Sequence, residues 1–333
     1  MTTGLEKVRL LTTSAHPDLM ENVSRILGID HAHYQMLKFP NENTLPQLLI
    51  NDEGSDVDGC TVFVFHTFAP VPTIEAEFAE FKKLMRAAKE NGAKEVIAVI
   101  GYFSYGRSHR KKPEGVPLLA KLYAEEIKLA GADQVVIVML HNLDVASYFG
   151  VPVIHLGAKY RIIEELQGLI DADNATLLTP DGGREERLAT FAKEMKLPII
   201  HGKKNRSGEG KSKYLGIEGE VKEIVIGIDD EISEGGTFED IAIDLIENYP
   251  ILKRFIYISA HGVLCGLANK KLSHIVDSAK SKGIKLEFIF TDSLPIPATK
   301  RLRNMKIISI AKMLADVVQA IHLGEKINPK YLY

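Results

Sequence analysis

The stretch EIVIGIDDEISEGGTFEDIAIDLI, residues 223–246, decides the fold because it joins three local patterns in one run. It begins with β-branched residues, continues through acids and two glycines, and ends in a segment with helical apolar spacing. A buried strand, a glycine-containing turn and a helix in this order are typical of a parallel α/β sheet. We therefore predict a strand over Ile224–Ile228, a loop over residues 229–236 and a helix from Thr237.

The same alternation continues outward on both sides of this stretch. Short β-branched runs recur with helical stretches between them, as expected of parallel strands linked by crossover helices. One helix is predicted over Ile74–Asn91, where apolar residues recur at helical spacing and Asn91-Gly92 ends the pattern. The predicted strands are Val8–Thr12, Thr61–His66, Glu95–Ile100, Gln134–Leu140, Thr176–Thr179, Ile199–His201, Ile224–Ile228, Phe255–Ser259, Leu286–Thr291 and Ile307–Ile310. So many runs suit two sheets better than one, and the fold class is α/β.

The order strand, loop, helix, strand occurs twice with similar lengths, which indicates an internal duplication. The first copy has its strand at residues 61–65 and its loop at 66–72, and only the second copy has a loop that looks suited to a ligand. A length of 333 residues also favours two domains over one. Because glycines and a proline punctuate the chain up to Gly157, we predict domains over residues 1–157 and 158–333.

Charge and apolar patterning exclude several classes of protein. Lysine plus arginine is 41 and aspartate plus glutamate is 44, which gives a net charge of −3 and disfavours a general nucleic-acid binder. Apolar runs such as residues 135–140 are too short to span a membrane, and the first residues lack a secretory pattern. We expect a cytoplasmic protein without membrane or nucleic-acid partners. Cys60 and Cys265 lie far apart and are expected to be two buried thiols.

Residues 202–213, GKKNRSGEGKSK, form a Gly-, Ser- and Lys-rich stretch without periodicity. This composition predicts an exposed mobile loop. One interpretation is a solvated surface loop with no further role. The other is a lid that brings cations over an anionic substrate.

The loop that begins at Asp229 combines groups that suit a phosphorylated sugar. Backbone amides of residues 234–237 would cradle a phosphate at the helix N-terminus, where glycines allow close approach. Asp229 and Asp230 would accept hydrogen bonds from sugar hydroxyls or hold Mg²⁺ through water. The alternative interpretation is an Asp-rich turn that only caps the helix.

The pattern D-D-x-x-S-x-G-G-T at residues 229–237 resembles the ribose-phosphate loop of type I phosphoribosyltransferases and of ribose-phosphate pyrophosphokinases. Other segments resemble the pyrophosphokinases in particular, and their order agrees. They are residues 99–127 with YFSYGRSHRKK, Ala130–Asp133 followed by Leu140-His141, Thr179–Gly183, Ala260–Leu264, Thr291–Pro295 and the closing SIAKMLADVVQAIHLGEKI. The resemblance extends from about Ser14 to Ile327, so the chain is identified as a member of the pyrophosphokinase family.

The resemblance implies two tandem type I phosphoribosyltransferase-like domains, each a mainly parallel sheet flanked by helices. It implies transfer of the diphosphoryl group of ATP to ribose 5-phosphate, giving phosphoribosyl pyrophosphate and AMP, with Mg²⁺ as cofactor. The first domain would form the nucleotide side and the oligomer contacts, and the second would carry the ribose-5-phosphate loop. Homo-oligomers based on dimers, including hexamers, are the implied assembly.

The resemblance also implies roles for individual residues. Those expected at ribose 5-phosphate are Asp229, Asp230, Ser233, Glu234, Gly235, Gly236 and Thr237. Those expected at the nucleotide are Phe39, Asn41, Asn43, Arg107, Ser108 and Arg110. The metal ligands would be His141 and Asp181, and the catalytic residues Lys204, Arg206 and His141. Lys203 is a rival to Lys204 because one extra residue nearby leaves the register open, and His141 has the alternative of a structural histidine at a strand end.

Several positions depart from the family pattern, mostly around the nucleotide. The F-x-D-G-E turn of the family reads FPNEN at residues 39–43, which removes both carboxylates, and its R-Q-D run reads Arg107-Ser108-His109. Glu234 stands where a threonine usually donates to the phosphate, and a carboxylate there repels a phosphate unless it turns outward. One residue is also missing between Asp181 and the glycines that follow it.

Two other functions compete with the synthetase. One is a non-catalytic family member that regulates a true synthetase, which Glu234 and the altered nucleotide turn would explain. The other is a phosphoribosyltransferase that consumes phosphoribosyl pyrophosphate, against which the duplication and the Leu140-His141 segment argue. Catalytic competence, donor preference, effectors and oligomer size do not follow from the sequence.

Overall fold

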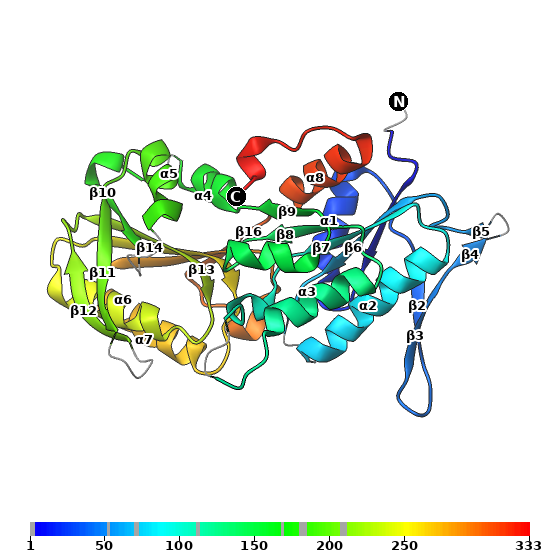
Figure 1. Cartoon of the computed structure of the whole chain (residues 1–333). Helices are drawn as coiled ribbons and strands as arrows, with labels where there is room; N and C mark the ends of the chain where they lie inside the picture. Colours follow the sequence, from blue (N-terminus) through cyan, green and yellow to red (C-terminus); the bar gives the residue numbers. More distant parts are fainter. Residues whose placement is uncertain are drawn as a thin grey trace. The chain divides into compact units, whose positions relative to one another are not determined.

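The computed structural model describes residues 4–51, 54–69, 73–110, 114–167, 170–179, 185–206 and 212–333. By its internal contacts the chain divides into two compact units, which are described separately (Figure 1). Unit 1 comprises Met1–Ala158, Ser293–Pro295 and Ser309–Tyr333, and unit 2 comprises Lys159–Asp292 and Ile296–Ile308. The division from sequence assigned residues 309–333 to the second domain, whereas these residues pack with unit 1.

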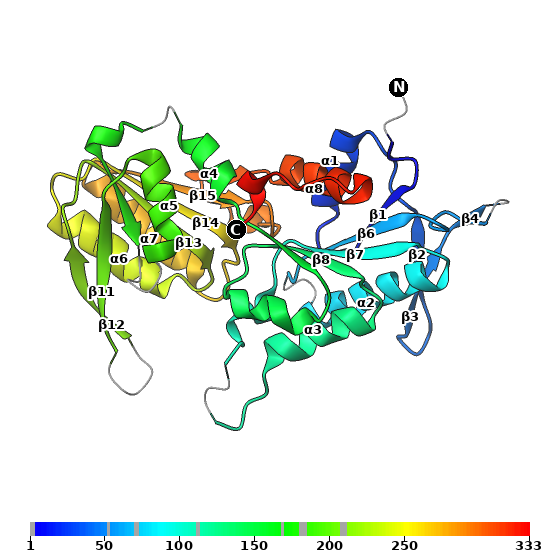
Figure 2. The ribbon, with the colours of Figure 1, turned by 45° about the horizontal axis from the view of Figure 1, so that its top comes forward.

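Unit 1 is built on a parallel sheet of five strands in the order β1-β6-β7-β8-β9. The strands are β1 (Val8–Thr12), β6 (Thr61–His66), β7 (Glu95–Ile100), β8 (Gln134–Val138) and β9 (Val153–Leu156). The helices are α1 (Pro17–Leu27), α2 (Ile74–Glu90), α3 (Leu119–Leu129) and α8 (Ala311–Leu323), with 3₁₀ turns η1 (Ser104–Arg107), η2 (Leu143–Phe149) and η6 (Pro329–Tyr331). Figures 1 and 2 show α2 and α3 on one face of the sheet and the packed pair α1 and α8 on the other.

Two small hairpins extend unit 1 beyond its main sheet. They are β2 (Tyr34–Lys38) with β3 (Thr44–Leu48), and β4 (Ile50–Asn51) with β5 (Gly54–Ser55). The sequence analysis did not predict them, because their residues lack a buried apolar run. In contrast, the predicted helix over Ile74–Asn91 is confirmed, with the Thr73 side chain accepting from the Ala76 N–H at its start and Asn91 at its C-cap.

Unit 2 contains a seven-stranded sheet in the order β12-β11-β10-β13-β14-β15-β16. Its strands are β10 (Ala175–Thr179), β11 (Ile199–Arg206), β12 (Ser212–Glu218), β13 (Ile224–Ile232), β14 (Arg254–Gly262), β15 (Lys285–Thr291) and β16 (Met305–Ile308). Its helices are α4 (Lys159–Leu166), α5 (Glu185–Met195), α6 (Gly236–Asn248) and α7 (Ala268–Ser281), with 3₁₀ turns η3 (Ala172–Asn174) and η5 (Ala298–Lys300). Strands β11 and β12 form an extended antiparallel hairpin (Figure 2). The other neighbouring strands of this sheet run parallel to one another.

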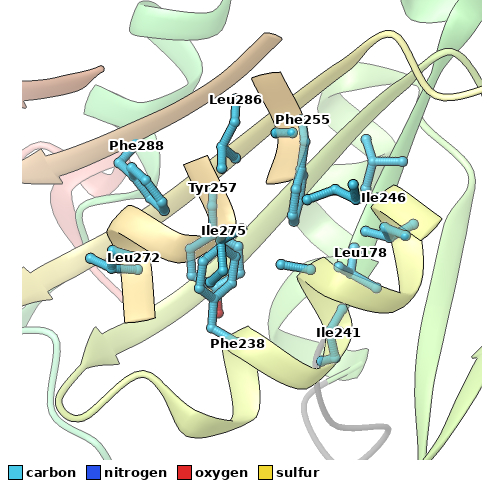
Figure 3. Close-up of a cluster of buried hydrophobic side chains, with 14 of the residues drawn as sticks. Leu178, Phe238, Ile241, Ile246, Phe255, Tyr257, Leu272, Ile275, Leu286 and Phe288 are labelled. Carbon is cyan, nitrogen blue, oxygen red and sulfur yellow. The ribbon is translucent and has the colours of Figure 1, made fainter. Parts of the chain in front are cut away.

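The core of unit 2 holds α6 and α7 against β14 and β15. Figure 3 shows Phe238 of α6 beside Tyr257 of β14, and their ring centroids lie 4.0 Å apart. Further buried side chains in this cluster are Leu178, Ile241, Ile246, Phe255, Leu272, Ile275, Leu286 and Phe288. Because this apolar contact fixes α6 on the sheet, it also fixes the turn that enters α6.

Two predicted loops are wrong in their extent. The loop predicted at residues 229–236 begins only after Ile232, because β13 keeps pairing with β14 as far as Gly262. The mobile loop predicted at residues 202–213 is largely the hairpin of β11 and β12, with residues 207–211 outside the described residues. The residues at these positions are mostly polar, so the sequence did not indicate that their backbone pairs with neighbouring strands.

A cluster of polar side chains lies beside the carboxyl end of β1 in unit 1. The Ser14 hydroxyl donates to Glu80 Oε2 at 2.6 Å and lies 3.3 Å from both carboxylate oxygens of Glu77. The Tyr34 hydroxyl donates to Glu80 Oε1 at 2.8 Å. Burial, together with the nearby charge of Glu80, raises the pKa of Glu77 to about 7.

We predict that Glu77→Gln stabilises the protein at pH 8 more than at pH 5.5. The folded pKa of about 7 lies above the ordinary value of 4.5, so the folded state favours the protonated acid. The stability that this group contributes is therefore present below pH 4.5 and is lost as pH rises through 7. A neutral amide avoids that loss, which urea denaturation at the two pH values measures.

Glu21→Gln is the matched control, because Glu21 is an exposed acid on α1. It should change the free energy of unfolding equally and slightly at both pH values. A Glu77→Gln effect that does not depend on pH would contradict the raised pKa.

Candidate functional site

The turn between β13 and α6 forms the centre of the predicted site in unit 2. Ser233 and Glu234 follow the last residue of β13. Gly235 is the N-cap of α6, and its φ of +74° lies in the left-handed region. A side chain at this φ is strained, so the sharp turn into α6 depends on glycine. The first N–H groups of α6 have no carbonyl partner within the helix and are therefore donors for a ligand.

The acids of the turn lie at the end of β13, within the paired part of the strand. Asp229 is half-buried, and Asp230 and Glu231 are buried. The Tyr257 hydroxyl donates to Asp229 Oδ2 at 3.2 Å, and the Asp230 N–H donates to Oδ1 at 2.9 Å. These contacts hold both oxygens of Asp229 in a defined orientation.

The orientation of Asp229 depends on a glycine two residues earlier in β13. A Cβ at Gly227 would lie 2.5 Å from Cδ2 and 2.8 Å from Cε2 of Tyr257. Only a residue without a side chain therefore lets the Tyr257 ring lie against β13 with its hydroxyl at Asp229. Tyr257 was not predicted from the sequence, although an isolated glycine inside an apolar strand is a signal of such a close approach.

The segment after β14 is joined to the same turn. The Leu264 N–H donates to the Ile232 carbonyl at 3.0 Å, and the Cys265 N–H donates to the Ser233 carbonyl at 3.1 Å. The Ser233 hydroxyl lies 3.1 Å from Cys265 Sγ. The predicted burial of both thiols is therefore confirmed for Cys60 and wrong for Cys265, which is partly exposed beside the turn.

The Glu234 side chain lies against the backbone of this neighbouring segment. Glu234 Oε1 is 3.3 Å from the place where a Cβ on Gly266 would stand, and Gly266 has φ of +55°. Glu234 as a residue is exposed. The carboxylate thus stays beside the turn, over Gly266.

Lys204 and Arg206 lie in β11, in register with Tyr214 and Ser212 of β12. The register shifts between Lys203 and Lys204, which is a β-bulge. Lys203 is exposed and forms an ion pair with Glu218 at 3.3 Å. The structure does not describe the side chains of residues 204–206 and of Thr237. The predicted metal ligand Asp181 also lies outside the described residues, because residues 180–184 are not described.

In unit 1 the structure brings His141 to the segment that begins at η1. The Cβ of His141 is 3.6 Å from the place where a Cβ on Gly106 would stand. His109 Nδ1 lies 3.0 Å from the Gly106 carbonyl oxygen, and the rings of His109 and His141 are 6.0 Å apart. Arg107 and Arg110 are exposed nearby in the chain, and Ser108 is half-buried.

The residues Phe39, Asn41 and Asn43 form the exposed turn that joins β2 to β3. The Phe39 N–H donates to the Asn43 carbonyl at 2.9 Å, and Phe39 is 44% exposed. The hairpin is fixed to α2 by Lys83, whose Nζ donates to Thr44 Oγ1 at 2.6 Å. An exposed aromatic ring at a hairpin tip is available to a ligand or to another chain.

Among the residues that the structure describes, no group of three or more His, Cys, Asp or Glu side chains converges as a metal site. No helix in the described ranges is long and apolar enough to cross a membrane.

Comparison with known proteins identifies the family. Residues 8–131 match the family described as the N-terminal domain of ribose phosphate pyrophosphokinase. A ribose-phosphate pyrophosphokinase of Caldanaerobacter subterraneus is 31% identical, covering 96% of this chain and 96% of the relative. The chain belongs to the ribose-phosphate pyrophosphokinase family.

Other members of this family match over nearly the full length as well. Ribose-phosphate pyrophosphokinase 4 of Saccharomyces cerevisiae is 28% identical, covering 99% of this chain and 96% of its own. The crystal structure of phosphoribosylpyrophosphate synthetase from Mycobacterium smegmatis superposes with a TM-score of 0.82 at 28% identity, covering 96% of this chain and 99% of that one. The predicted family and the α/β fold of two phosphoribosyltransferase-like domains are confirmed.

We predict that Gly227→Ala lowers the free energy of unfolding by about 1–3 kcal/mol, because the added methyl group displaces the Tyr257 ring in a packed core. Urea denaturation measures the loss. The same substitution in a Tyr257→Leu background is the control, since the smaller side chain leaves room for the methyl group. An equal loss in both backgrounds would contradict the proposed clash.

Proposed function

We propose that the chain transfers the diphosphoryl group of ATP to the 1-hydroxyl of ribose 5-phosphate, giving phosphoribosyl pyrophosphate and AMP. The observation that carries the proposal is the β13–α6 turn, with Asp229 held at the strand end and Gly235 opening the helix. Membership of the ribose-phosphate pyrophosphokinase family supports it.

At the acceptor, Asp229 and Asp230 accept hydrogen bonds from the ribose hydroxyls. The 5-phosphate binds at residues 233–237, namely Ser233, Glu234, Gly235, Gly236 and Thr237, where helix N–H groups and the helix dipole favour an anion. The contact of Tyr257 with Asp229 supports this assignment, because an oriented carboxylate selects the geometry of the hydroxyls that it binds.

At the donor, Arg107 and Arg110 bind the nucleotide phosphates, and Ser108 lies between them in the chain. Phe39, Asn41 and Asn43 bind the nucleotide through the exposed turn of the β2–β3 hairpin. We also propose a homo-oligomer based on dimers or hexamers, in which this turn serves the nucleotide site of a neighbouring subunit. We further propose that unit 1 forms the nucleotide side and unit 2 the acceptor side of a cytoplasmic enzyme.

Mg²⁺ is the proposed cofactor, held by His141 and Asp181 at the triphosphate. The carboxylates Asp229 and Asp230 supply the oxygen atoms that Mg²⁺ prefers, directly or through water, so the acids of the chain suit this ion. When bound, Mg²⁺ neutralises charge on the transferring group. Of the proposed ligands, His141 is fixed against Gly106, while Asp181 lies outside the described residues.

Lys204 and Arg206 stabilise the charge that develops on the transferring diphosphoryl group. Two lysines compete for the catalytic position in β11. The ion pair of Lys203 with Glu218 favours Lys204, because an ammonium engaged by a carboxylate is less available to a substrate.

A second function is favoured by one specific observation. The Glu234 carboxylate lies beside the phosphate turn, over Gly266, where it repels an anion. A non-catalytic homologue that regulates a synthetase would tolerate this charge. It would also tolerate Asn41 and Asn43 at the two positions where the family has carboxylates.

The decisive assay is AMP formation from ATP and Mg²⁺ with and without ribose 5-phosphate, repeated with other nucleoside triphosphates. We expect AMP and phosphoribosyl pyrophosphate, identified by mass, only when ribose 5-phosphate is present. Binding of ribose 5-phosphate without turnover of any donor would favour the regulatory function instead.

We predict that the double substitution Lys204→Ala with Arg206→Ala lowers turnover by about 10³-fold or more, because loss of a single transition-state donor already costs about 10²–10³. Melting temperature should change little. The control is Lys203→Ala, which removes a lysine of the same strand that pairs with Glu218 and should leave turnover nearly unchanged. Unchanged turnover in the double variant would refute the catalytic role of this strand.

A further inference from the structure

A lysine that belongs to none of the sequence motifs lies at the entrance of α6. Lys271 is on α7, and its Nζ is 3.4 Å from the place where a Cβ on Gly236 would stand. Gly236 is the first residue of α6, so the ammonium lies over the first turn of the helix. The Lys271 side chain is only 26% exposed, which limits screening of its charge by solvent.

The end of β13, the turn that follows it and the start of α6 carry several carboxylates, one of which pairs with this ammonium. Glu239 Oε2 lies 3.5 Å from Lys271 Nζ, and His274 Nδ1 lies 3.9 Å from Glu239 Oε1. Glu234 adds a second carboxylate at the turn, where it lies over Gly266. Asp229 and Asp230 add two more acids at the end of β13.

A phosphate dianion that approaches the N-terminus of α6 therefore meets several carboxylates. The helix dipole and the free N–H groups offset only part of this repulsion, because the dipole corresponds to about half a unit charge. Lys271 provides a full positive charge at the same place. Gly236 has no side chain, so the ammonium approaches the backbone of the first turn closely at this residue.

We propose that Lys271 is a phosphate-binding residue of the ribose-5-phosphate site, where its ammonium binds the 5-phosphate and compensates the charge of Glu234. This inference rests on the proposed function. Glu239 holds the side chain over the turn in the free protein, and the phosphate provides a stronger partner when it binds. A lysine suits this role because it binds phosphate as a compact point charge.

The test is the affinity for ribose 5-phosphate of the full chain with Mg²⁺, measured by calorimetry for the wild type and for variants at Lys271. Lys271→Ala and Lys271→Gln should weaken binding roughly 10-fold to 100-fold, the range expected for one charged hydrogen bond. Lys271→Arg should restore most of the affinity. Lys270→Ala is the matched control, because Lys270 is exposed on the same helix, and it should bind as the wild type does.

Two further measurements separate phosphate binding from a structural role. In steady-state assays Lys271→Gln should raise the KM for ribose 5-phosphate and leave the KM for ATP unchanged. Glu234→Thr should tighten binding of ribose 5-phosphate several-fold, and it should partly rescue Lys271→Gln because the repelling charge is gone.

The outcomes distinguish this inference from the function on which it rests. If the wild type does not bind ribose 5-phosphate at all, the proposed function fails and this inference fails with it. If the wild type binds and Lys271→Gln binds equally well, only the role of Lys271 is overturned. Should Lys271→Ala not fold, the comparison of Lys271→Gln with Lys271→Arg decides in the same way.

Discussion

The site in unit 2 depends on one close contact, between the backbone of Gly227 and the ring of Tyr257. Because Gly227 has no Cβ, the ring packs against β13 and beside Phe238 of α6, and its hydroxyl reaches Asp229. A single aromatic side chain therefore packs in the apolar core and also orients Asp229, the acid that we propose as a ligand of the ribose. Packing of the helix and orientation of the carboxylate are two results of the same contact.

Local patterns in the sequence were sufficient for most of the fold. Runs such as residues 62–65 and 135–138 are apolar throughout because parallel strands are buried on both faces, and such runs are easy to find. The helix at Ile74–Glu90 was predictable because its apolar residues recur at helical spacing and Asn91 ends the pattern. Strand β12 and the ends of β11 and β13 contain polar residues, and backbone pairing within the β11–β12 hairpin and with β14 stabilises them, so no local apolar pattern identified their extent.

The residues of the candidate site also differ in whether the sequence could reveal them, according to whether they stand inside one motif or reach it from another element. Asp229, Gly235 and Gly236 stand in a short motif whose spacing is itself the signal, so the sequence indicated them. Tyr257 and Lys271 act from a neighbouring strand and a neighbouring helix, and their relation to the motif exists only after folding. Residues that orient or neutralise a motif are therefore harder to predict than the motif.

The packing of α8 on α1 has a consequence for how the chain folds as it is made. Both helices and the bridge between Leu156 and Leu332 lie in unit 1, although nearly the whole of unit 2 separates them in sequence. Helix α1, whose Leu19, Met20 and Val23 are buried, packs on α8, and α8 is synthesised only after unit 2. Unit 1 therefore begins synthesis before unit 2 but is completed only after it, and the loss of α8 would expose the packed face of α1.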